Sequence, residues 1–356
     1  MKNLAIFSFV LFLVSPLFGQ HVPTLKPTGE RLTKVKSSAV QNFESGNRNF
    51  QNKNYGQAKI DYRNAIKADK SFAEAYINLS KVYESEDSLQ EAKLVLETAI
   101  SSMIPLNERA FAQLGRVTYQ LEDYDKAEYN FKQAVALNNK VDDYHYFVGL
   151  SLLKMNDSEE AETFFKKASE LNASSRNKIG LSNTYIQNGK NDEAISVLQS
   201  ISNYESNPEA TLNLAIAYHN KQDVEMTDKY LKMAQTNGAG DQAVFQHLFG
   251  LIQSEKQNND AAKTAFDKAI QLDERNATYY NDRASHFIRI ENFKDALSDL
   301  DIAIEIQPDF SKAYYNRGIA KEMMRDEEGA CLDWEYAFFL GYVKAEELLN
   351  DPICNK

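Results

Sequence analysis

The chain has 356 residues, 43% of them hydrophobic, with only 14 glycines and 7 prolines. This composition provides a core and suits many short helices, but it leaves little material for turn-rich β structure. The formal net charge of −11 repels phosphate groups and argues against nucleic acid and anionic lipid as partners.

Residues 1–19 have the composition of a secretory signal peptide. Lys2 gives a positively charged start, and residues 4–18 carry no charge. That stretch is shorter than the roughly 20 residues that a membrane-spanning helix needs, and the small Gly19 offers a cleavage site. We expect export to the periplasm or the medium, with no stable membrane span after cleavage; an uncleaved N-terminal anchor is the alternative. Residues 20–38, with two prolines and four basic residues, indicate an exposed lead-in.

An internal repeat occupies residues 39–342. A small anchor residue recurs every 33 to 35 positions, with a large apolar residue four positions after it and a small residue twelve before it. The anchors are Ala58, Ala92, Ala127, Ala161, Ala194, Thr227, Ala262, Ala296 and Ala330. Seven positions after the anchor the residue is alanine in eight repeats, and Ile201 is the exception.

The apolar residues of each period fall at helical spacing in two stretches, which a polar break separates. Each repeat is therefore predicted to be a pair of antiparallel helices. Small side chains allow close approach where the two helices cross. One pair cannot bury both of its faces, so neighbouring pairs must stack. The predicted repeats begin near residues 39, 73, 108, 142, 175, 208, 243, 277 and 311.

The last segment, residues 343–356, is predicted to be a capping helix and a tail, with Pro352 ending the helix. Cys331 and Cys354 lie 23 positions apart at this end of the chain. In an exported protein they are candidates for a disulfide, and two free thiols are the alternative.

The repeat resembles the tetratricopeptide repeat family, in an exported protein of bacterial type. The strings YYNRG at residues 314–318 and ALSDL at residues 296–300 are typical of that family. The resemblance implies an all-α fold, a right-handed α-solenoid superhelix of nine helix-turn-helix repeats with a C-terminal capping helix. It also implies protein binding rather than catalysis. The family's closing proline occurs only at Pro308, and its first-helix aromatic is replaced in the fifth to seventh repeats.

In such solenoids the first helix of each pair lines the concave surface. Positions fifteen, eleven and eight before the anchor should face this groove. In the fourth to sixth repeats they are mostly apolar, which predicts a partner site. The candidate residues are Tyr146, Leu150, Leu153, Ile179, Asn183, Ile186, Leu212, Ile216 and His219. The alternatives are that a tight superhelix covers this stripe, or that the helical phase is off by one.

Chemistry-bearing motifs are scarce. The five histidines show no metal-ligand spacing within one helix, although His219 and His247 could approach each other. Gly238 and Gly240 resemble a dinucleotide loop, but they follow a predicted helix rather than a strand. A known use of the family, a lysine clamp on a C-terminal carboxylate, is not expected, since apolar residues occupy its first lysine position. We predict no catalytic residue, no metal and no cofactor.

The sequence thus favours a scaffold of the cell envelope that binds a protein or peptide on its concave groove. Two alternatives stay open. One is a solenoid enzyme whose site is built from dispersed acidic residues, which paired carboxylates of raised pKa would reveal. The other is a structural protein that assembles end to end, against which the predicted capping helix argues.

Overall fold

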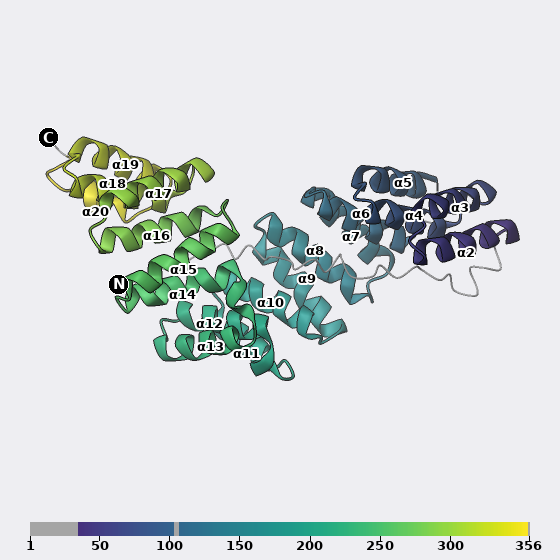
Figure 1. Cartoon of the computed structure of the whole chain (residues 1–356), viewed down its shortest axis with the longest axis horizontal. Helices are drawn as coiled ribbons and strands as arrows, with labels where there is room; N and C mark the ends of the chain where they lie inside the picture. Colours follow the sequence, from purple (N-terminus) through teal and green to yellow (C-terminus); the bar gives the residue numbers. More distant parts are fainter. Residues whose placement is uncertain (1–34, 103–106, 355–356) are drawn as a thin grey trace. The chain divides into compact units, whose positions relative to one another are not determined.

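The computed structural model describes residues 35–102 and 107–354 (Figure 1). The expected signal peptide and residues 20–34 of the expected lead-in lie outside the described residues. The helices fall into two compact units, one that ends at Ser202 and one that begins at Asn203. Within the described ranges every regular element is a helix.

The first unit contains five helix pairs. They are α2 (Ser37–Gln51) with α3 (Tyr55–Ala68), α4 (Ala73–Ser85) with α5 (Leu89–Ser102), α6 (Glu108–Gln120) with α7 (Tyr124–Leu137), α8 (Asp142–Lys154) with α9 (Ser158–Leu171), and α10 (Ser175–Gln187) with α11 (Asn191–Gln199). Consecutive pairs pack through the second helix of one and the first helix of the next, as α3 does on α4 and α7 on α8.

The second unit contains four pairs and a short final helix. They are α12 (Pro208–Asn220) with α13 (Val224–Thr236), α14 (Ala243–Glu255) with α15 (Asn259–Leu272), α16 (Ala277–Arg289) with α17 (Phe293–Ile306), α18 (Ser311–Met323) with α19 (Glu327–Phe339), and α20 (Ala345–Leu349). Two 3-10 turns, Tyr204–Ser206 and Ala239–Asp241, precede α12 and α14. In the described part of the chain, the predicted all-α array of nine helix-turn-helix repeats is confirmed. From the second repeat on, the first helices begin at the predicted positions.

The core forms where the sequence pattern places small residues. All nine anchors are fully buried, and the large residues four positions later are at most 3% exposed. A Cβ atom on Gly149 would lie 2.6 Å from the ring of Phe165. The two helices of this pair therefore cross too closely for any side chain at residue 149, as the alternation of small and large residues predicts.

The turn inside each pair is the same throughout. Five positions before every anchor the backbone is left-handed, with φ between 58° and 72°. The residues are Lys53, Asp87, Glu122, Asn156, Gly189, Gln222, Gln257, Glu291 and Arg325. The next residue caps the second helix in five pairs; the Asp123 carboxylate, for example, accepts from the backbone N–H of Lys126. This turn reverses the chain in three residues.

The two helices of a pair differ in burial. Residues 73–82 of α4 are all buried, including Glu74, Asn78 and Lys81. In α5 only Ala92, Leu96 and Ala99 are buried. First helices inside the array are thus enclosed by their neighbours, as α4 is, whereas second helices keep an outer face in solvent. No described helix combines the length and the apolar character that a bilayer crossing requires.

Candidate functional site

The first helices carry the nine predicted groove residues, divided between the two units. Tyr146, Leu150 and Leu153 lie on α8 and Ile179, Asn183 and Ile186 on α10, all between 6% and 9% exposed. On α12, Leu212 is 4% exposed and Ile216 8%, while His219 is half-buried. These side chains therefore do not form a broad exposed apolar patch. Their burial favours the alternative in which the array covers much of the stripe, and binding along it stays a prediction.

A charged cluster lies on the first helices of the second and third repeats. Lys81 on α4 is only 5% exposed. Burial and the positive charges of Arg116 and Arg109 lower the pKa of Lys81 to about 8, although Glu84 opposes them. Lys81 therefore lies near two further basic groups and near the carboxylate of Glu84. These basic residues gather in a chain whose net charge is −11.

The carboxylate of this cluster is only partly satisfied. The side-chain amide of Gln113 donates to Glu84 Oε2 at 2.8 Å, while Glu84 Oε1 is buried with no hydrogen bond. Burial raises the pKa of Glu84, against the nearby charges of Arg116 and Lys81. The site thus places basic side chains beside one open acceptor, a combination that suits a polar segment of another molecule.

A different polar network occupies the first helices of the last three repeats. Asp282 on α16 is 4% exposed, and its carboxylate lies 2.9 Å from His247 Nε2 and 3.1 Å from Lys312 Nζ. Burial raises the pKa of this carboxyl, but Lys312 and His247 outweigh that effect and hold the pKa below its usual range.

Two of these helices, α16 and α18, also share amide hydrogen bonds. The amide of Asn316 donates to Asn281 Oδ1 at 2.9 Å and to Ser285 Oγ at 3.1 Å. The amide of Asn281 in turn donates to the carboxylate of Asp282. Buried polar groups here satisfy one another across three successive repeats, so this network stabilises the stack.

The histidines do not assemble into a metal site. His247 contacts Asp282, and His286 Nδ1 lies 2.8 Å from the hydroxyl of Ser254. Burial lowers the pKa of His219; the charge of Glu255 opposes this effect, and His247 adds to it. Across residues 35–102 and 107–354, no three histidine, cysteine or acidic side chains are placed to hold a metal ion.

Burial raises the pKa of Glu84, Glu209 and Asp299, a property that an acidic solenoid enzyme would require, and Asp299 lies in an ion pair. Burial raises the pKa of Asp299 even though Arg283 donates to both of its oxygens, at 2.6 and 2.7 Å. Arg283 also donates to Asp267 at 2.6 Å and so joins two repeats. This arrangement is that of a structural ion-pair network.

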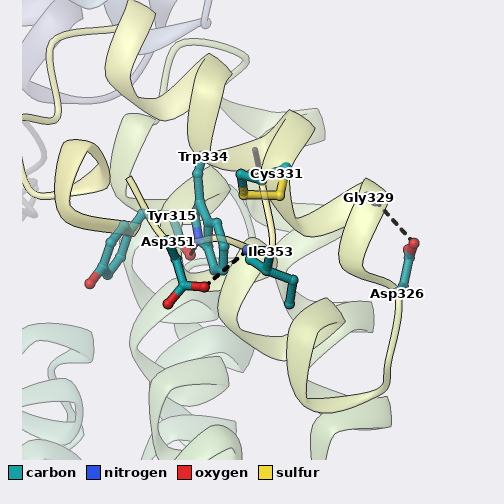
Figure 2. Close-up of a disulfide and its surroundings, with 8 residues drawn as sticks. Tyr315, Asp326, Gly329, Cys331, Trp334, Asp351 and Ile353 are labelled. Atoms are coloured by element: carbon teal, nitrogen blue, oxygen red, sulfur yellow. Dashed lines mark hydrogen bonds between the residues drawn. A yellow bond between two sulfur atoms is a disulfide. The ribbon is translucent and has the colours of Figure 1, made fainter. Parts of the chain in front are cut away.

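The C-terminal end is covalently closed (Figure 2). Cys331 on α19 and Cys354 form a disulfide, with their Cα atoms 5.5 Å apart. Close to it, the fully buried Trp334 donates from its indole N–H to the carbonyl of Tyr315 at 3.2 Å, and Asp351 accepts from the backbone N–H of Ile353 (Figure 2). The bond ties the chain end beyond α20 to the last repeat.

Sequence reasoning missed both polar clusters as sites. Lys81 and Arg116 each lie eleven positions before an anchor, on the face predicted to line the groove, so charge at that position was the available signal. Asp282 and Lys312 come from different repeats, and only the stacking of α16 on α18 brings them together.

Comparison with known proteins agrees with this geometry. The sequence profile of the tetratricopeptide repeat matches residues 73–102, 142–175 and 243–276. RNA polymerase II-associated protein 3 of Xenopus tropicalis is 35% identical over 92 residues, which are 24% of this chain and 14% of that protein. Hsp70-Hsp90 organizing protein of Triticum aestivum is 22% identical over 233 residues, which are 61% of this chain and 38% of that protein. The chain thus spans less than half of either relative.

Two solved structures share the fold. A chain of the APC/C hetero-tetramer Cut9-Hcn1 superposes with a TM-score of 0.61 at 13% identity, over 87% of this chain and 75% of that one. A tetratricopeptide repeat protein from Parabacteroides merdae gives a TM-score of 0.54 at 18% identity, over 67% of this chain and 94% of that one. Three of the helix pairs therefore match the tetratricopeptide repeat profile, and the chain shares the fold of these two structures.

Proposed function

We propose that the chain is a non-catalytic scaffold that binds a segment of a partner protein along the first helices of its repeats. Proteins built from this repeat commonly serve as protein-interaction scaffolds, and one relative is named for organizing Hsp70 and Hsp90. The nine residues from Tyr146 to His219 remain proposed contacts. Because they are nearly buried, a partner would touch the edges of these side chains rather than a wide apolar surface.

The observation that carries the proposal is the charged cluster around Lys81. Burial and the charges of Arg116 and Arg109 disfavour the charged form of Lys81, and Glu84 favours it. An acidic group of a partner would favour that form further, and a donor on the same segment would satisfy Glu84 Oε1. We therefore propose that the partner segment carries at least one carboxylate.

A random peptide library displayed on phage tests the proposal directly. Panning on the purified protein should enrich acidic peptides, and Arg109→Gln with Arg116→Gln should weaken their binding at least tenfold. Arg275→Gln, at an exposed arginine outside the cluster, is the matched control. Circular dichroism should show the same helicity for all three proteins. Enrichment of peptides without acidic residues, or equal binding to the double variant, would contradict the proposed site.

We further propose that the scaffold works outside the cytoplasm, in the periplasm or the medium. The support is the signal-like composition of residues 1–19 and the presence of one disulfide and no other cysteine. N-terminal sequencing of the protein from its source should find a new terminus shortly after Gly19. A terminus at Met1 in a membrane fraction would favour the retained anchor, and one in the soluble cytoplasmic fraction would overturn export.

A further inference from the structure

The outer face of the last repeat differs from that of every other repeat. Positions two, six and nine after the anchor lie on the solvent side of the second helix, opposite the buried anchor. In α19 they are Leu332, Tyr336 and Phe339, which are 60%, 44% and 79% exposed. In the other eight repeats these three positions hold at most one large apolar residue. Val343, which follows α19 directly, is 70% exposed.

The fold of the last repeat does not account for this apolar face. Trp334, Ala330 and Ala337 bury the opposite side of α19 completely. The final helix α20 packs on α19, yet the four apolar side chains stay exposed. The ring of Tyr336 lies 4.6 Å from that of Tyr314 and 6.0 Å from that of Phe339, so the patch is continuous.

The size of the patch fits an interface. Two aromatic side chains, a leucine and a valine at these exposures present on the order of 400 Å². If the partner surface is of similar size, the contact buries about 800–1,000 Å² in total, which is the range of a weak, reversible association. Aromatic residues are also the type enriched at the centre of such contacts.

The charges beside the patch indicate what covers it. Glu328 and Glu335 are exposed on the same side of α19. On the first repeat the matched face of α3 carries Ile60 where α19 has Leu332, and Arg63 where α19 has Glu335. Lys67 stands where α19 has Phe339. Ile60 is 49% exposed, and Arg63 and Lys67 are exposed as well.

We propose that the α19 face of one copy docks on the α3 face of a second copy. Ile60 would pack on the aromatic patch, and Arg63 would meet Glu335 and the ring faces of Tyr336 or Phe339. Pairing α19 with α19 would instead bring acidic side chains together. The contact uses the outer faces of the two terminal repeats, so the capping segment does not obstruct it.

Such a contact joins two different surfaces. A chain of copies therefore always has one unoccupied α3 face and one unoccupied α19 face. Copies would therefore add head to tail into short open chains whose length depends on concentration. Because opposite charges flank the contact, salt should weaken it.

Sedimentation velocity of the purified protein over a range of concentrations tests this. We expect concentration-dependent species larger than a monomer, which shift toward monomer in high salt. Leu332→Ser with Phe339→Ser should give monomers, and so should Arg63→Glu with Lys67→Glu. Val224→Ser with Lys140→Glu, at exposed positions outside both faces, should self-associate like the unchanged protein.

Mixing the two monomeric variants gives the decisive result. One retains the α3 face and the other retains the α19 face, so an equimolar mixture should form a dimer and nothing larger. If the Arg63 and Lys67 variant still dimerises alone, the patch pairs with itself and the proposed partner face is wrong. If the unchanged protein is monomeric throughout, the patch does not bind a second copy and the proposal fails. Circular dichroism and thermal melting of each variant separate loss of contact from loss of fold.

Discussion

The first helices of the second and third repeats and those of the last three repeats surround a buried charge differently. In the last three repeats Asp282 is buried between His247 and Lys312, and Lys312 supplies a charge of opposite sign. In the second and third repeats Lys81 is buried near two further basic groups and the carboxylate of Glu84. The same helix-pair fold thus holds a network that lowers the pKa of an acid in one unit and a cluster that lowers the pKa of a base in the other.

This difference shows how one repeat array can stabilise its fold with one buried cluster and bind a partner with another. A buried charge that its own neighbours satisfy contributes to the stack, and removing a member leaves the others unpaired. Burial and neighbouring positive charge disfavour the charged form of a lysine such as Lys81, and an acidic group of a partner would favour that form. Substitutions in the two clusters should therefore change stability with opposite signs.

The largest effect is expected from breaking the network in the last three repeats. Asp282→Ala leaves the buried His247 and the half-buried Lys312 without their shared acceptor and should lower the free energy of unfolding by about 3 kcal/mol. Asp301→Ala is the matched control, since this carboxylate also pairs with a basic side chain but is 64% exposed; it should cost about 0–1 kcal/mol. Urea denaturation followed by circular dichroism measures both.

The pH dependence of the Asp282 contribution follows from its lowered pKa. The carboxyl is more acidic in the folded protein than in the unfolded chain. Its contribution is therefore complete above the ordinary aspartate pKa of about 4 and is lost as the pH falls below that value. The gap between the unchanged protein and Asp282→Ala should narrow in acid. An equal gap at pH 7 and pH 3 would contradict the assignment.

The stability of the last repeats should also depend on the disulfide between Cys331 and Cys354, in addition to the network around Asp282. The disulfide closes a loop between residues 23 positions apart. Reducing it should lower the free energy of unfolding by about 3 kcal/mol in the chain-entropy description. Intact mass with and without reductant checks that the bond forms in protein from an oxidising compartment, and urea denaturation of Cys331→Ser with Cys354→Ser checks its effect. If the double variant unfolds with unchanged stability, the network alone holds this end.

The smallest effect, with the opposite sign, is expected at Lys81. Lys81→Met removes a charge that burial and two arginines disfavour, and the free energy of unfolding should rise by about 1–2 kcal/mol at pH 7. Because the pKa of Lys81 is lowered to about 8 in the fold, the native lysine loses its proton before the unfolded chain does. The free energy of unfolding of the unchanged protein should therefore rise relative to that of the variant as the pH rises from 8 to 10. Destabilisation by Lys81→Met at pH 7 would remove the contrast between the two clusters.

The sequence predicted the positions of the helix pairs better than it predicted which side chains are exposed. The spacing of Ala58 and its eight counterparts predicted where the helix pairs begin, because close helix crossings require small residues whatever surrounds them. Leu150 and Ile186 were expected on an exposed face, because the periodicity of one helix does not include the neighbouring repeats that cover it. The contact of Asp282 with Lys312 joins residues 30 positions apart, and no local pattern signals it.

The left-handed turn residues were not foreseen either. Gly189, Asn156 and Asp87 are of the residue types that favour this backbone conformation, whereas the other six are lysine, glutamate, glutamine or arginine.

The eight turns without glycine allow the rigidity of the array to be graded one repeat at a time. Each non-glycine residue bears a local backbone cost of about 1 kcal/mol that glycine would largely avoid. Replacing Glu122 or Glu291 by glycine would stabilise the helix pair that contains it. The substitution would change neither the core nor the exposed faces of the helices. Single substitutions in the turns could therefore make some helix pairs more stable than others. They would determine which pair of the solenoid unfolds first.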